Sequence, residues 1–332
     1  MSVSVIIPAY NRATLLPFTL AAVLAQMPPP DEVIVVDDGS TDDTAAVAAA
    51  HAGPVRCIGI KNSGDLAARN VGLRAARGER VAFCDSDDVW RPGFLASMDA
   101  LWQAEPGLHA AYCDFLFLRD DVWSTDSKFA AAPPGFWDGL RMVSPEAGVF
   151  DVPVVERLIE FQPLFPSCMV AERKFLLALG GWDEGVGRTL GSDFATALLV
   201  AEHPPLGIVR PPLVGIRKHA GNFSGDGQAM NLGDAFVLEH VLATRPGLSP
   251  QAPAIRASIA RRRGEALDTA FARGDFAAVR RIAGQLGAVS GRTRIKRLVA
   301  GLPEPLRGAA AAVLLGLGSA TGSPRLSPGA GA

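Results

Sequence analysis

The sequence predicts an α/β protein whose mostly parallel sheet is flanked by helices, with a helical region after it. Three observations support this fold. Short apolar segments alternate with helical segments along the first hundred residues, as in strands joined by helices in a parallel sheet. Polar clusters follow these apolar segments, at the carboxyl ends of strands, where such sheets bind ligands. After about residue 230 the apolar positions recur at helical spacing.

The amino-terminal part repeats one design: an apolar strand, a polar cluster and then, in most cases, a helix. The predicted elements are strands over 4–8, 32–36, 56–60 and 81–84 and helices over roughly 13–26 and 66–76. The first strand is expected to break at Pro8, and Asn11 is placed to cap the helix after it. A sequence selected for packing alone has no reason to collect polar residues at strand ends. This edge of the sheet is therefore the predicted functional site.

Three carboxylates, Asp85, Asp87 and Asp88, follow the fourth strand within four positions. Side chains alternate along a strand, so Asp85 and Asp87 are expected on the same side. Carboxylates this close repel one another, and hard cations such as Mg²⁺ and Mn²⁺ favour oxygen ligands. The alternative is an acidic turn that caps the next helix, and this segment alone leaves both interpretations open.

Four motifs, taken in order, resemble the signatures of family-two inverting glycosyltransferases with the GT-A fold, a Rossmann-like architecture. They lie at 4–12, 36–42, 68–72 and 84–90, and the last reads Cys-Asp-Ser-Asp-Asp-Val-Trp. Weaker agreement continues through Gly-Gly-Trp-Asp-Glu at 180–184 to about residue 224. The resemblance implies a nucleotide-diphosphate-sugar donor, Mg²⁺ or Mn²⁺ as cofactor, and direct displacement with inversion at the anomeric carbon.

The resemblance also implies which residues bind the donor. It places Pro8, Tyr10, Asp38, Asn62, Gly64, Arg69 and Asp85 at the nucleotide sugar. Asp38 matches a residue that hydrogen-bonds the base, and Arg69 matches an arginine near the phosphates, which a guanidinium binds through paired hydrogen bonds. Each residue has a structural alternative. Asp38 can be a turn aspartate, Arg69 a solvated helix arginine, and Gly64 a turn glycine with a positive φ.

The same resemblance implies three metal ligands. Asp87 matches the principal ligand, and Asp85 matches a carboxylate that contacts the ribose or the metal. Residues 217–224 resemble a closing loop over the diphosphate, in which His219 either completes the metal shell or forms ordinary hydrogen bonds. The adjacent Arg217 and Lys218 could neutralise the leaving diphosphate.

Inverting transfer needs a base that takes the proton from the acceptor hydroxyl. The resemblance places this base at the second position of a Glu-Asp pair, which is Asp193 in this sequence. The first position is Ser192, so repulsion by a neighbouring glutamate, one cause of a raised pKa, is missing. Asp193 could also cap the apolar helix predicted over 194–201. Trp182 either packs against an acceptor sugar or lies buried against the sheet.

Composition bounds the cellular setting. The net charge is −2, which gives no basic footprint for nucleic acid. The four cysteines at 57, 84, 113 and 168 are widely spaced and suit a reducing compartment. No secretion signal is recognised and no apolar stretch reaches 18 residues, so the prediction is a cytoplasmic protein without a membrane span.

The predicted domains are a GT-A domain over 1–228, a helical region over 229–302 and an apolar, flexible tail over 303–332. The first of these divides into a nucleotide-sugar half, 1–100, and an acceptor half, 101–228. In the helical region a basic amphipathic stretch at 292–299 precedes an apolar stretch at 306–316. These stretches are either a solvated face or oligomer contact, or a peripheral contact with the inner face of a membrane. The last dozen residues are expected to be disordered.

The predicted activity is that of a metal-dependent inverting glycosyltransferase of the hexosyltransferase type. It would transfer a sugar to a hydroxyl of a glycan or lipid-linked glycan, in assembly of a bacterial surface polysaccharide or glycolipid of the cell envelope. Two alternatives remain open. The chain could transfer a sugar to a polyprenyl phosphate, or it could be a non-catalytic partner that binds nucleotide sugars, for which Ser192 is the sequence support.

Overall fold

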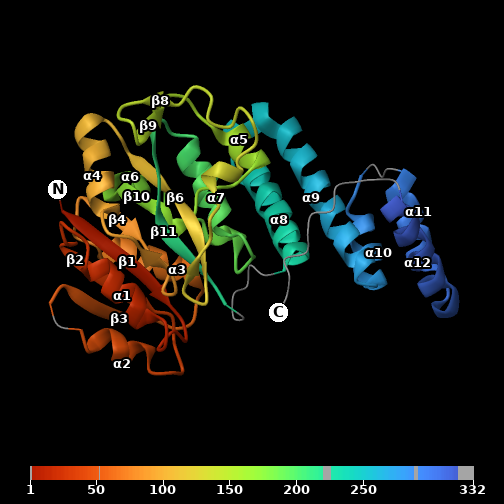
Figure 1. The fold of residues 1–332 in the computed structure, drawn as a ribbon, viewed down its shortest axis with the longest axis horizontal. Coiled ribbons are helices and arrows are strands. Elements are labelled where there is room, and N and C mark those ends of the chain that lie inside the picture. The colour runs from red at the N-terminus through yellow and green to blue at the C-terminus, as the bar shows by residue number, and fades with distance from the viewer. Residues whose placement is uncertain (1, 52, 220–225, 288–290, 321–332) are drawn as a thin grey trace.

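A mixed sheet of eleven strands forms the centre of the molecule, and a series of helices extends from one side of it (Figure 1). This is a computed structural model, and it describes residues 2–51, 53–219, 226–287 and 291–320. The sheet order is β3-β2-β1-β4-β10-β6-β11-β9-β8, with β5 paired to β11 and β7 paired to β6. The predicted α/β class with C-terminal helices is confirmed.

The nucleotide-sugar half forms one end of the sheet. Its elements are β1 (Val3–Ala9), α1 (Leu16–Leu24), β2 (Glu32–Asp37), α2 (Thr44–Ala49), β3 (Val55–Gly59), α3 (Asp65–Ala75) and β4 (Arg80–Phe83). Strands β3, β2, β1 and β4 pair in parallel. The residues over 33–36 are fully buried, which accounts for a continuous apolar run rather than an alternating one. The carboxyl ends of these four strands therefore lie at one edge, where the polar clusters follow.

The predicted break at Pro8 is wrong, because β1 continues through this residue in register with Val36 of β2. The oxygen of Ile6 accepts a hydrogen bond from Cys84 N at 3.1 Å, so the backbone of Ile6 faces β4. Pro8 lies two residues further along and faces the same side, where β4 has already ended. The missing N–H of proline thus removes no ladder hydrogen bond.

Asn11 does not cap α1, as the sequence predicted. Helix α1 begins at Leu16 without a side-chain cap, and a proline lies in its first turn. Instead, Asn11 has a positive φ of 52°, and its Oδ1 accepts a hydrogen bond from Thr41 N at 2.8 Å. Asn11 N in turn donates to Ser40 Oγ at 2.9 Å. The residue therefore joins the end of β1 to the turn after β2.

The segment from residue 89 to residue 218, which begins with the last part of the nucleotide-sugar half, completes the sheet. Its elements are β5 (Val89–Trp90), α4 (Phe94–Ala104), β6 (Ala110–Arg119), β7 (Val122–Trp123), β8 (Arg141–Met142), β9 (Ala147–Phe150), α5 (Val155–Glu160), β10 (Met169–Glu172), α6 (Arg173–Ala178), α7 (Asp193–Ala201) and β11 (Leu206–Lys218). Strand β10 lies antiparallel between β4 and β6 and so joins the two halves. Strand β11 runs parallel to β6 and ends beside the site.

Helix α3 lies unusually close to the sheet because Gly72 faces β1. A Cβ atom at this position would lie 2.4 Å from Cγ2 of Ile6, which is shorter than any normal contact. The close approach brings the buried residues of α3, among them Arg69 and Asn70, down to the carboxyl ends of the strands. Glycine at 72 thus helps to position a charged group of the site.

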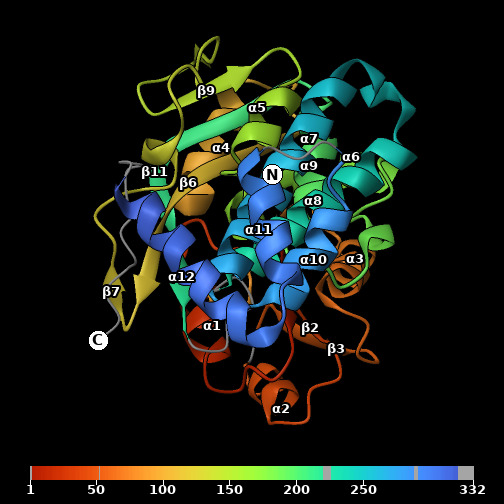
Figure 2. The ribbon, with the colours of Figure 1, turned by 90° about the vertical axis from the view of Figure 1, so that its right-hand side faces the viewer.

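Within the described residues, five α-helices follow the sheet: α8 (Gly227–Thr244), α9 (Ala252–Ala272), α10 (Phe276–Gly284), α11 (Gly291–Gly301) and α12 (Glu304–Ala320). Apolar residues of α8 and of the start of α9 join the main core. The end of α9 packs with α10, α11 and α12 in a second core (Figures 1 and 2). The two cores meet within α9, and the domain boundaries at 228 and 302 remain predictions.

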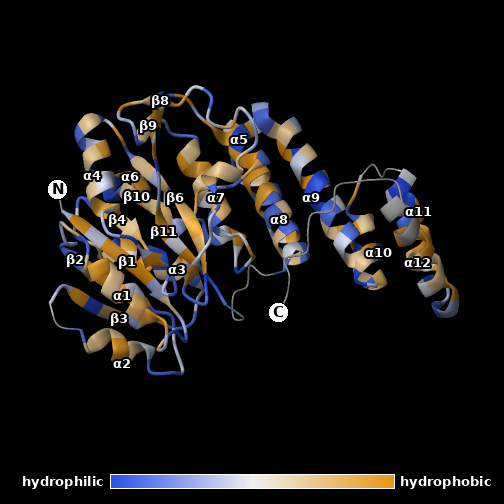
Figure 3. Ribbon diagram, in the orientation of Figure 1, coloured by the Kyte–Doolittle hydropathy of each residue, from blue (hydrophilic) through white to orange (hydrophobic). Residues whose placement is uncertain are grey.

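Apolar residues fill the strands and the inner sides of the helices, and Figure 3 shows them along β1, β4 and β6. Among the helices in the described ranges, none has the length and apolar character needed to cross a membrane. The last dozen residues, which were expected to be disordered, lie outside the part of the chain that the structure describes.

Candidate functional site

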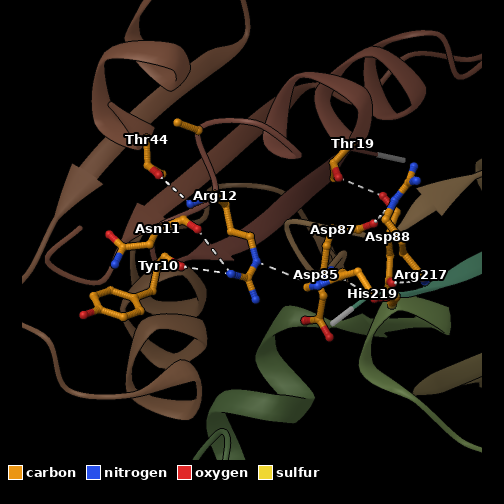
Figure 4. Close-up of polar contacts among 12 residues, drawn as sticks. Tyr10, Asn11, Arg12, Thr19, Thr44, Asp85, Asp87, Asp88, Arg217 and His219 are labelled. Atoms are coloured by element: carbon orange, nitrogen blue, oxygen red, sulfur yellow. Dashed lines mark hydrogen bonds and ion pairs between the residues drawn. The ribbon is translucent and has the colours of Figure 1, made fainter. Parts of the chain in front are cut away.

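The acidic residues after β4 lie beside the residues that follow β1, as the parallel topology requires (Figure 4). Asp87 is the centre of this cluster. Its Oδ2 lies 3.0 Å from Nε2 of His219, at the end of β11, and 3.6 Å from Nε of Arg12, just after β1. The structure thus brings together Asp87 and His219, which are 132 positions apart in the sequence. Arg12 is the last residue of the first motif, but it was not predicted to be a site residue.

The side chains beside Asp87 supply too few metal ligands to bind a divalent cation alone, so a bound phosphate or water would have to supply the others. In the described ranges, no three His, Cys, Asp or Glu side chains are close enough together to form a metal site. Asp87 and His219 converge and supply one carboxylate and one imidazole. Among the described residues, the Asp85 side chain is bound through Oδ1, and its other oxygen accepts no hydrogen bond from them. Mg²⁺ commonly takes one or two carboxylates and completes its shell with phosphate oxygens and water, which suits this set.

Arg69 is a buried ion-pairing residue rather than a solvated helix arginine. Only 3% of its surface is exposed. It donates a hydrogen bond to Asp85 Oδ1 at 2.6 Å, pairs with Asp65 one turn earlier on α3, and lies over the ring of Trp182. Burial raises the pKa of Asp85, and the positive charge of Arg69 opposes that rise. Arg69 therefore holds one of the predicted metal ligands in place.

Asp88 supports the site instead of capping a helix. Its Oδ2 accepts a hydrogen bond from Ser167 Oγ at 2.5 Å, and its Oδ1 accepts one from Arg217 N at 2.9 Å. The same Ser167 Oγ accepts from Asp85 N at 2.9 Å. Burial raises the pKa of Asp88 well above its ordinary value. The residue fixes the end of β11 against the acidic loop, and helix α4 begins only at Phe94.

The two predicted cations of β11 are held by the protein. Arg217 donates through Nε to the Asp87 backbone oxygen at 3.0 Å and forms an ion pair with Asp121 at 2.8 Å. Burial lowers the pKa of Lys218, whereas the charges of Asp88 and Asp87 raise it. Residues 220–225, the rest of the predicted closing loop, lie outside the described residues.

Asp38 shapes the predicted donor loop. It is buried, and its two oxygens accept hydrogen bonds from Ser63 N at 2.6 Å and Gly64 N at 2.8 Å. Gly64 has φ +99° and ψ 162°, a conformation that essentially only glycine adopts. Asn62 Oδ1 accepts a hydrogen bond from Arg188, in the loop before α7. The turn role of Gly64 is confirmed, and contact of this loop with a nucleotide remains a prediction.

The remaining donor residues lie at the end of β1. Pro8 is buried within the strand, whereas Tyr10 directly after it is 44% exposed. Figure 4 shows Tyr10 beside Asn11 and Arg12, on the side of the cluster away from His219. Tyr10 is therefore the one of the two whose side chain can reach a ligand.

Asp193 is the first residue of α7, and its carboxylate forms no hydrogen bond or ion pair within the described ranges. Its side chain keeps some solvent exposure but lies deep between the two halves, and this burial raises the pKa of Asp193 to about 7. Arg69 acts against the shift, whereas Asp65 and Asp85 add to it. The predicted helix-cap hydrogen bond is not formed.

Two comparisons of sequence agree with this arrangement. Residues 4–128 match the family described as Glycosyl transferase family 2. An uncharacterised glycosyltransferase of Bacillus subtilis (strain 168), YwdF, is 35% identical over 99 residues, which are 30% of this chain and 37% of that protein. Residues 4–128 are a glycosyl transferase family 2 domain. The match spans little more than a third of the curated relative's length, so the relative informs this domain and not the whole chain.

Solved structures extend the likeness over nearly the whole chain. The structure of Staphylococcus aureus TarS 1–349 with UDP covers 95% of this chain and 88% of its own, at TM-score 0.59 and 17% identity. The same protein with UDP-GlcNAc covers 98% and 93%, at TM-score 0.60 and 16% identity. At these identities the likeness concerns the fold. The GT-A fold with C-terminal helices, predicted from the motifs, is confirmed.

Asp193 has an acidic neighbour, Asp234, that comes from a different part of the chain. The glutamate expected before Asp193 is replaced by Ser192, yet Asp234 of α8 adds to the raised pKa of Asp193. Asp234 forms an ion pair with Arg262 of α9 and lies against Gly191, where a Cβ would be 2.4 Å from Asp234 Oδ1. Sequence reasoning missed Asp234 because no local motif marks it. The missing charge is thus supplied by a helix.

Trp182 is buried, so the second of its two interpretations is confirmed. Only 3% of its surface is exposed, and its ring meets that of Phe83 edge to face at 4.9 Å. Its backbone N–H and oxygen bind the amide of Asn70 on α3. Trp182 therefore packs beneath Arg69 and separates the pair Arg69–Asp85 from the core.

Proposed function

We propose that the protein is a metal-dependent inverting glycosyltransferase that transfers a sugar from a nucleotide-diphosphate donor to an acceptor hydroxyl. Membership of residues 4–128 in glycosyl transferase family 2 supports the reaction class. The observation that carries the proposal is Asp193, a carboxylate that has no partner in the part of the chain that the structure describes and whose pKa is raised to about 7. A general base works best when its pKa lies near the operating pH.

The donor side binds and orients the nucleotide sugar. We assign Tyr10 and the loop at 62–64, which Asp38 holds in place, to nucleotide binding. The role of Arg69 is to hold Asp85 in position. Asp87 and His219, with Asp85 beside them, would hold Mg²⁺ or Mn²⁺ against the diphosphate. When bound, such an ion neutralises the charge that develops on the leaving diphosphate. Arg12 lies 3.6 Å from Asp87 and adds positive charge at the same place.

The acceptor side moves one proton. Asp193 removes the hydrogen of the acceptor hydroxyl while that oxygen attacks the anomeric carbon from the face opposite the leaving group. The new glycosidic bond forms as the bond between the anomeric carbon and the diphosphate breaks, and the nucleoside diphosphate leaves with the electron pair. No covalent bond between sugar and protein is needed. A pKa of about 7 suits Asp193 to accept a proton near neutral pH.

The substrates are proposed by class. TarS, which shares the fold, is described in complexes with UDP and UDP-GlcNAc, so uridine-diphosphate sugars come first among the donors to test. We assign the acceptor to a glycan or lipid-linked glycan of bacterial surface-polysaccharide or glycolipid assembly. A cytoplasmic location is supported by the cysteines, which are all unpaired, three of them buried. The net charge of −2 does not favour nucleic acid as a partner.

Calorimetry of the full chain against a panel of nucleotide-diphosphate sugars, with and without Mn²⁺, tests the donor side. We expect one donor to bind in the presence of metal, and Asp87→Ala to abolish the metal-dependent part of the binding. The matched control is Asp151→Ala, which removes an exposed carboxylate in an ion pair far from the site. A folded protein that binds no donor in the panel would contradict the proposal.

One variant separates the two alternatives from transfer to a hydroxyl. A polyprenyl phosphate is already ionised near neutral pH, so Asp193→Asn would barely slow transfer to it. A non-catalytic partner protein would bind the donor and form no product with any acceptor. Loss of product with donor binding intact in Asp193→Asn supports transfer to a hydroxyl and argues against both alternatives.

A further inference from the structure

Exposed apolar side chains concentrate on the last two described helices, far from the candidate site. Ile295 and Leu298 are exposed on α11, and Leu306, Val313 and Leu315 are exposed on α12. Leu298 is 71% exposed and Val313 is 62% exposed. Soluble proteins rarely expose large apolar side chains in a contiguous group unless the group binds another surface. We call the outer side of α11 and α12 the hairpin surface.

Arginines accompany the apolar residues on α11. Arg292, Arg294 and Arg297 are exposed, and Arg294 and Arg297 flank Leu298 on the side that does not pack against the second core. The helix has no acidic residue. Its remaining cation, Lys296, points the other way and pairs with Asp268 at 2.6 Å. The outer side of α11 is therefore basic and apolar, and no acid neutralises it within the helix.

Part of the hairpin surface, namely Arg292, Ile295 and Leu315, borders a hollow shared by the two helices. A groove of about 140 Å³ runs between them, and its lining is Phe271, Arg292, Ile295, Lys296, Leu314 and Leu315. The arginine end of α11 thus borders the apolar side of α12. Figures 1 and 2 show both helices at the end of the molecule that lies opposite the sheet, and Figure 3 shows the apolar character of α12.

We propose that the hairpin surface docks on an anionic lipid bilayer. Leu298, Val313 and their exposed apolar neighbours enter the boundary between headgroups and acyl chains, and the three arginines pair with lipid phosphates. The protein lies on the bilayer, because no helix of the described residues is long and apolar enough to cross it.

Charge complementarity favours lipid over a second copy of the chain. In a symmetric contact the same surface meets itself, so the arginines of one α11 would face those of the other, with no acid of α11 to receive them. Anionic headgroups supply the missing negative charge. This inference goes beyond sugar transfer and does not depend on it.

Cosedimentation of the full chain with vesicles tests this proposal. We use phosphatidylcholine vesicles with and without phosphatidylglycerol, and we expect binding only when the anionic lipid is present, weakening as salt is added. Arg294→Glu with Arg297→Glu should weaken binding by at least roughly 30-fold, given the contribution of each basic residue near such a surface. Leu298→Ser with Val313→Ser should weaken it as well, by removing buried apolar area on the membrane.

Matched controls change the same groups elsewhere. Lys174→Glu with Arg210→Glu reverses two exposed charges of the sheet domain, and Val152→Ser removes an exposed apolar side chain, which is 59% exposed. These variants should bind vesicles like the parent chain. All hairpin variants should unfold at the parent temperature and keep donor binding, which separates this proposal from that of the catalytic site.

Three results would overturn the proposal: vesicle binding that does not depend on phosphatidylglycerol, equal losses in the hairpin and control variants, or no binding by the parent chain. Concentration-dependent self-association that Leu298→Ser abolishes, without vesicle binding, would assign the surface to a second copy instead.

Discussion

The donor side and the acceptor side of the proposed site differ in whether their aspartates have hydrogen-bond or ion-pair partners. On the donor side the aspartates have protein partners: Asp38 binds two backbone N–H groups, Asp85 binds Arg69, and Asp87 binds His219. On the acceptor side Asp193 has none among the described residues. In the proposed mechanism this difference means that hydrogen bonds and ion pairs fix the donor side, whereas Asp193 stays able to accept a proton.

This contrast has an energetic consequence. A buried carboxylate is costly unless hydrogen bonds or opposite charges compensate it. The partners of Asp85 provide that compensation, whereas the cost of burying Asp193 is only partly offset, by the more distant charge of Arg69. Ionisation of Asp193 on the acceptor side should therefore lower the free energy of unfolding. Ionisation of the donor-side carboxylates should not lower it.

The largest effect is expected from Asp193→Asn. Loss of a general base should slow product formation roughly 10²–10⁴-fold and leave donor affinity unchanged. The folded-state pKa of about 7 lies above the ordinary value of 3.8, so ionisation of Asp193 destabilises the fold as pH rises through this range. Asparagine should then raise the free energy of unfolding by about 4 kcal/mol at pH 8 and by almost nothing below pH 4. Product assays and thermal unfolding at both pH values provide the measurement.

Asp85→Asn is the matched variant on the donor side. It leaves the buried Arg69 without this partner and should lower the free energy of unfolding by about 3 kcal/mol. If both substitutions destabilise the protein at pH 8, the contrast between the two sides is wrong.

The second effect concerns the loop that Asp38 holds. Gly64→Ala places a side chain at φ +99° and ψ 162°, next to Arg188, at a cost of about 1–3 kcal/mol. The loop must shift to relieve this strain, and we expect donor affinity to fall about tenfold by calorimetry. Gly93→Ala is the control, since Gly93 also has a positive φ of 90° but lies before α4 with open space around it. Gly93→Ala should lower the stability and leave donor affinity unchanged. An equal loss of donor affinity in both variants would contradict a specific role of the loop in donor binding.

Sequence motifs located the strands and polar turns of the proposed donor side because each of these parts is local. A strand, its polar end and a glycine turn lie within a few residues, as at 36–42, and the parallel topology then brings the ends together. The partner contacts were not predictable in the same way. Arg12 and Asp87 meet only because β1 and β4 are neighbours, and Pro8 fits β1 only because β4 ends early.

The acceptor side was predicted in one residue, Asp193, and not in its surroundings. Asp234 reaches the vicinity of Gly191 through the packing of α8, and its position depends on Arg262 of α9. Helical periodicity shows which side of α8 is buried, but not which strand end or loop lies opposite it. Ser192 does lack the negative charge that a glutamate would place next to Asp193. Asp234, 41 positions after Asp193, supplies a negative charge that raises the pKa of Asp193 instead.

The role of Asp234 leads to the third prediction. Its negative charge raises the pKa of Asp193, so Asp234→Asn should lower that pKa and move the acidic limb of the pH–rate profile to lower pH. We expect a displacement of about half a pH unit, which is roughly a threefold gain relative to the parent enzyme on that limb. The profile of kcat/KM against pH measures it. Glu239→Gln, an exposed member of an ion pair on the same helix, should leave the profile unchanged.

The smallest effect tests whether the two sides communicate. Arg188, in the loop before α7, donates a hydrogen bond to Asn62 of the donor loop, so one exposed contact joins the segment of the base to the segment that holds the donor. Arg188→Ala should weaken donor affinity about twofold to threefold, the value of one such hydrogen bond, without changing the unfolding temperature. Arg210→Ala, an exposed arginine of β11, is the control. If donor affinity is unchanged but the pH–rate profile moves, Arg188 acts on Asp193 alone, and the donor loop keeps its shape through Asp38 without help from the acceptor side.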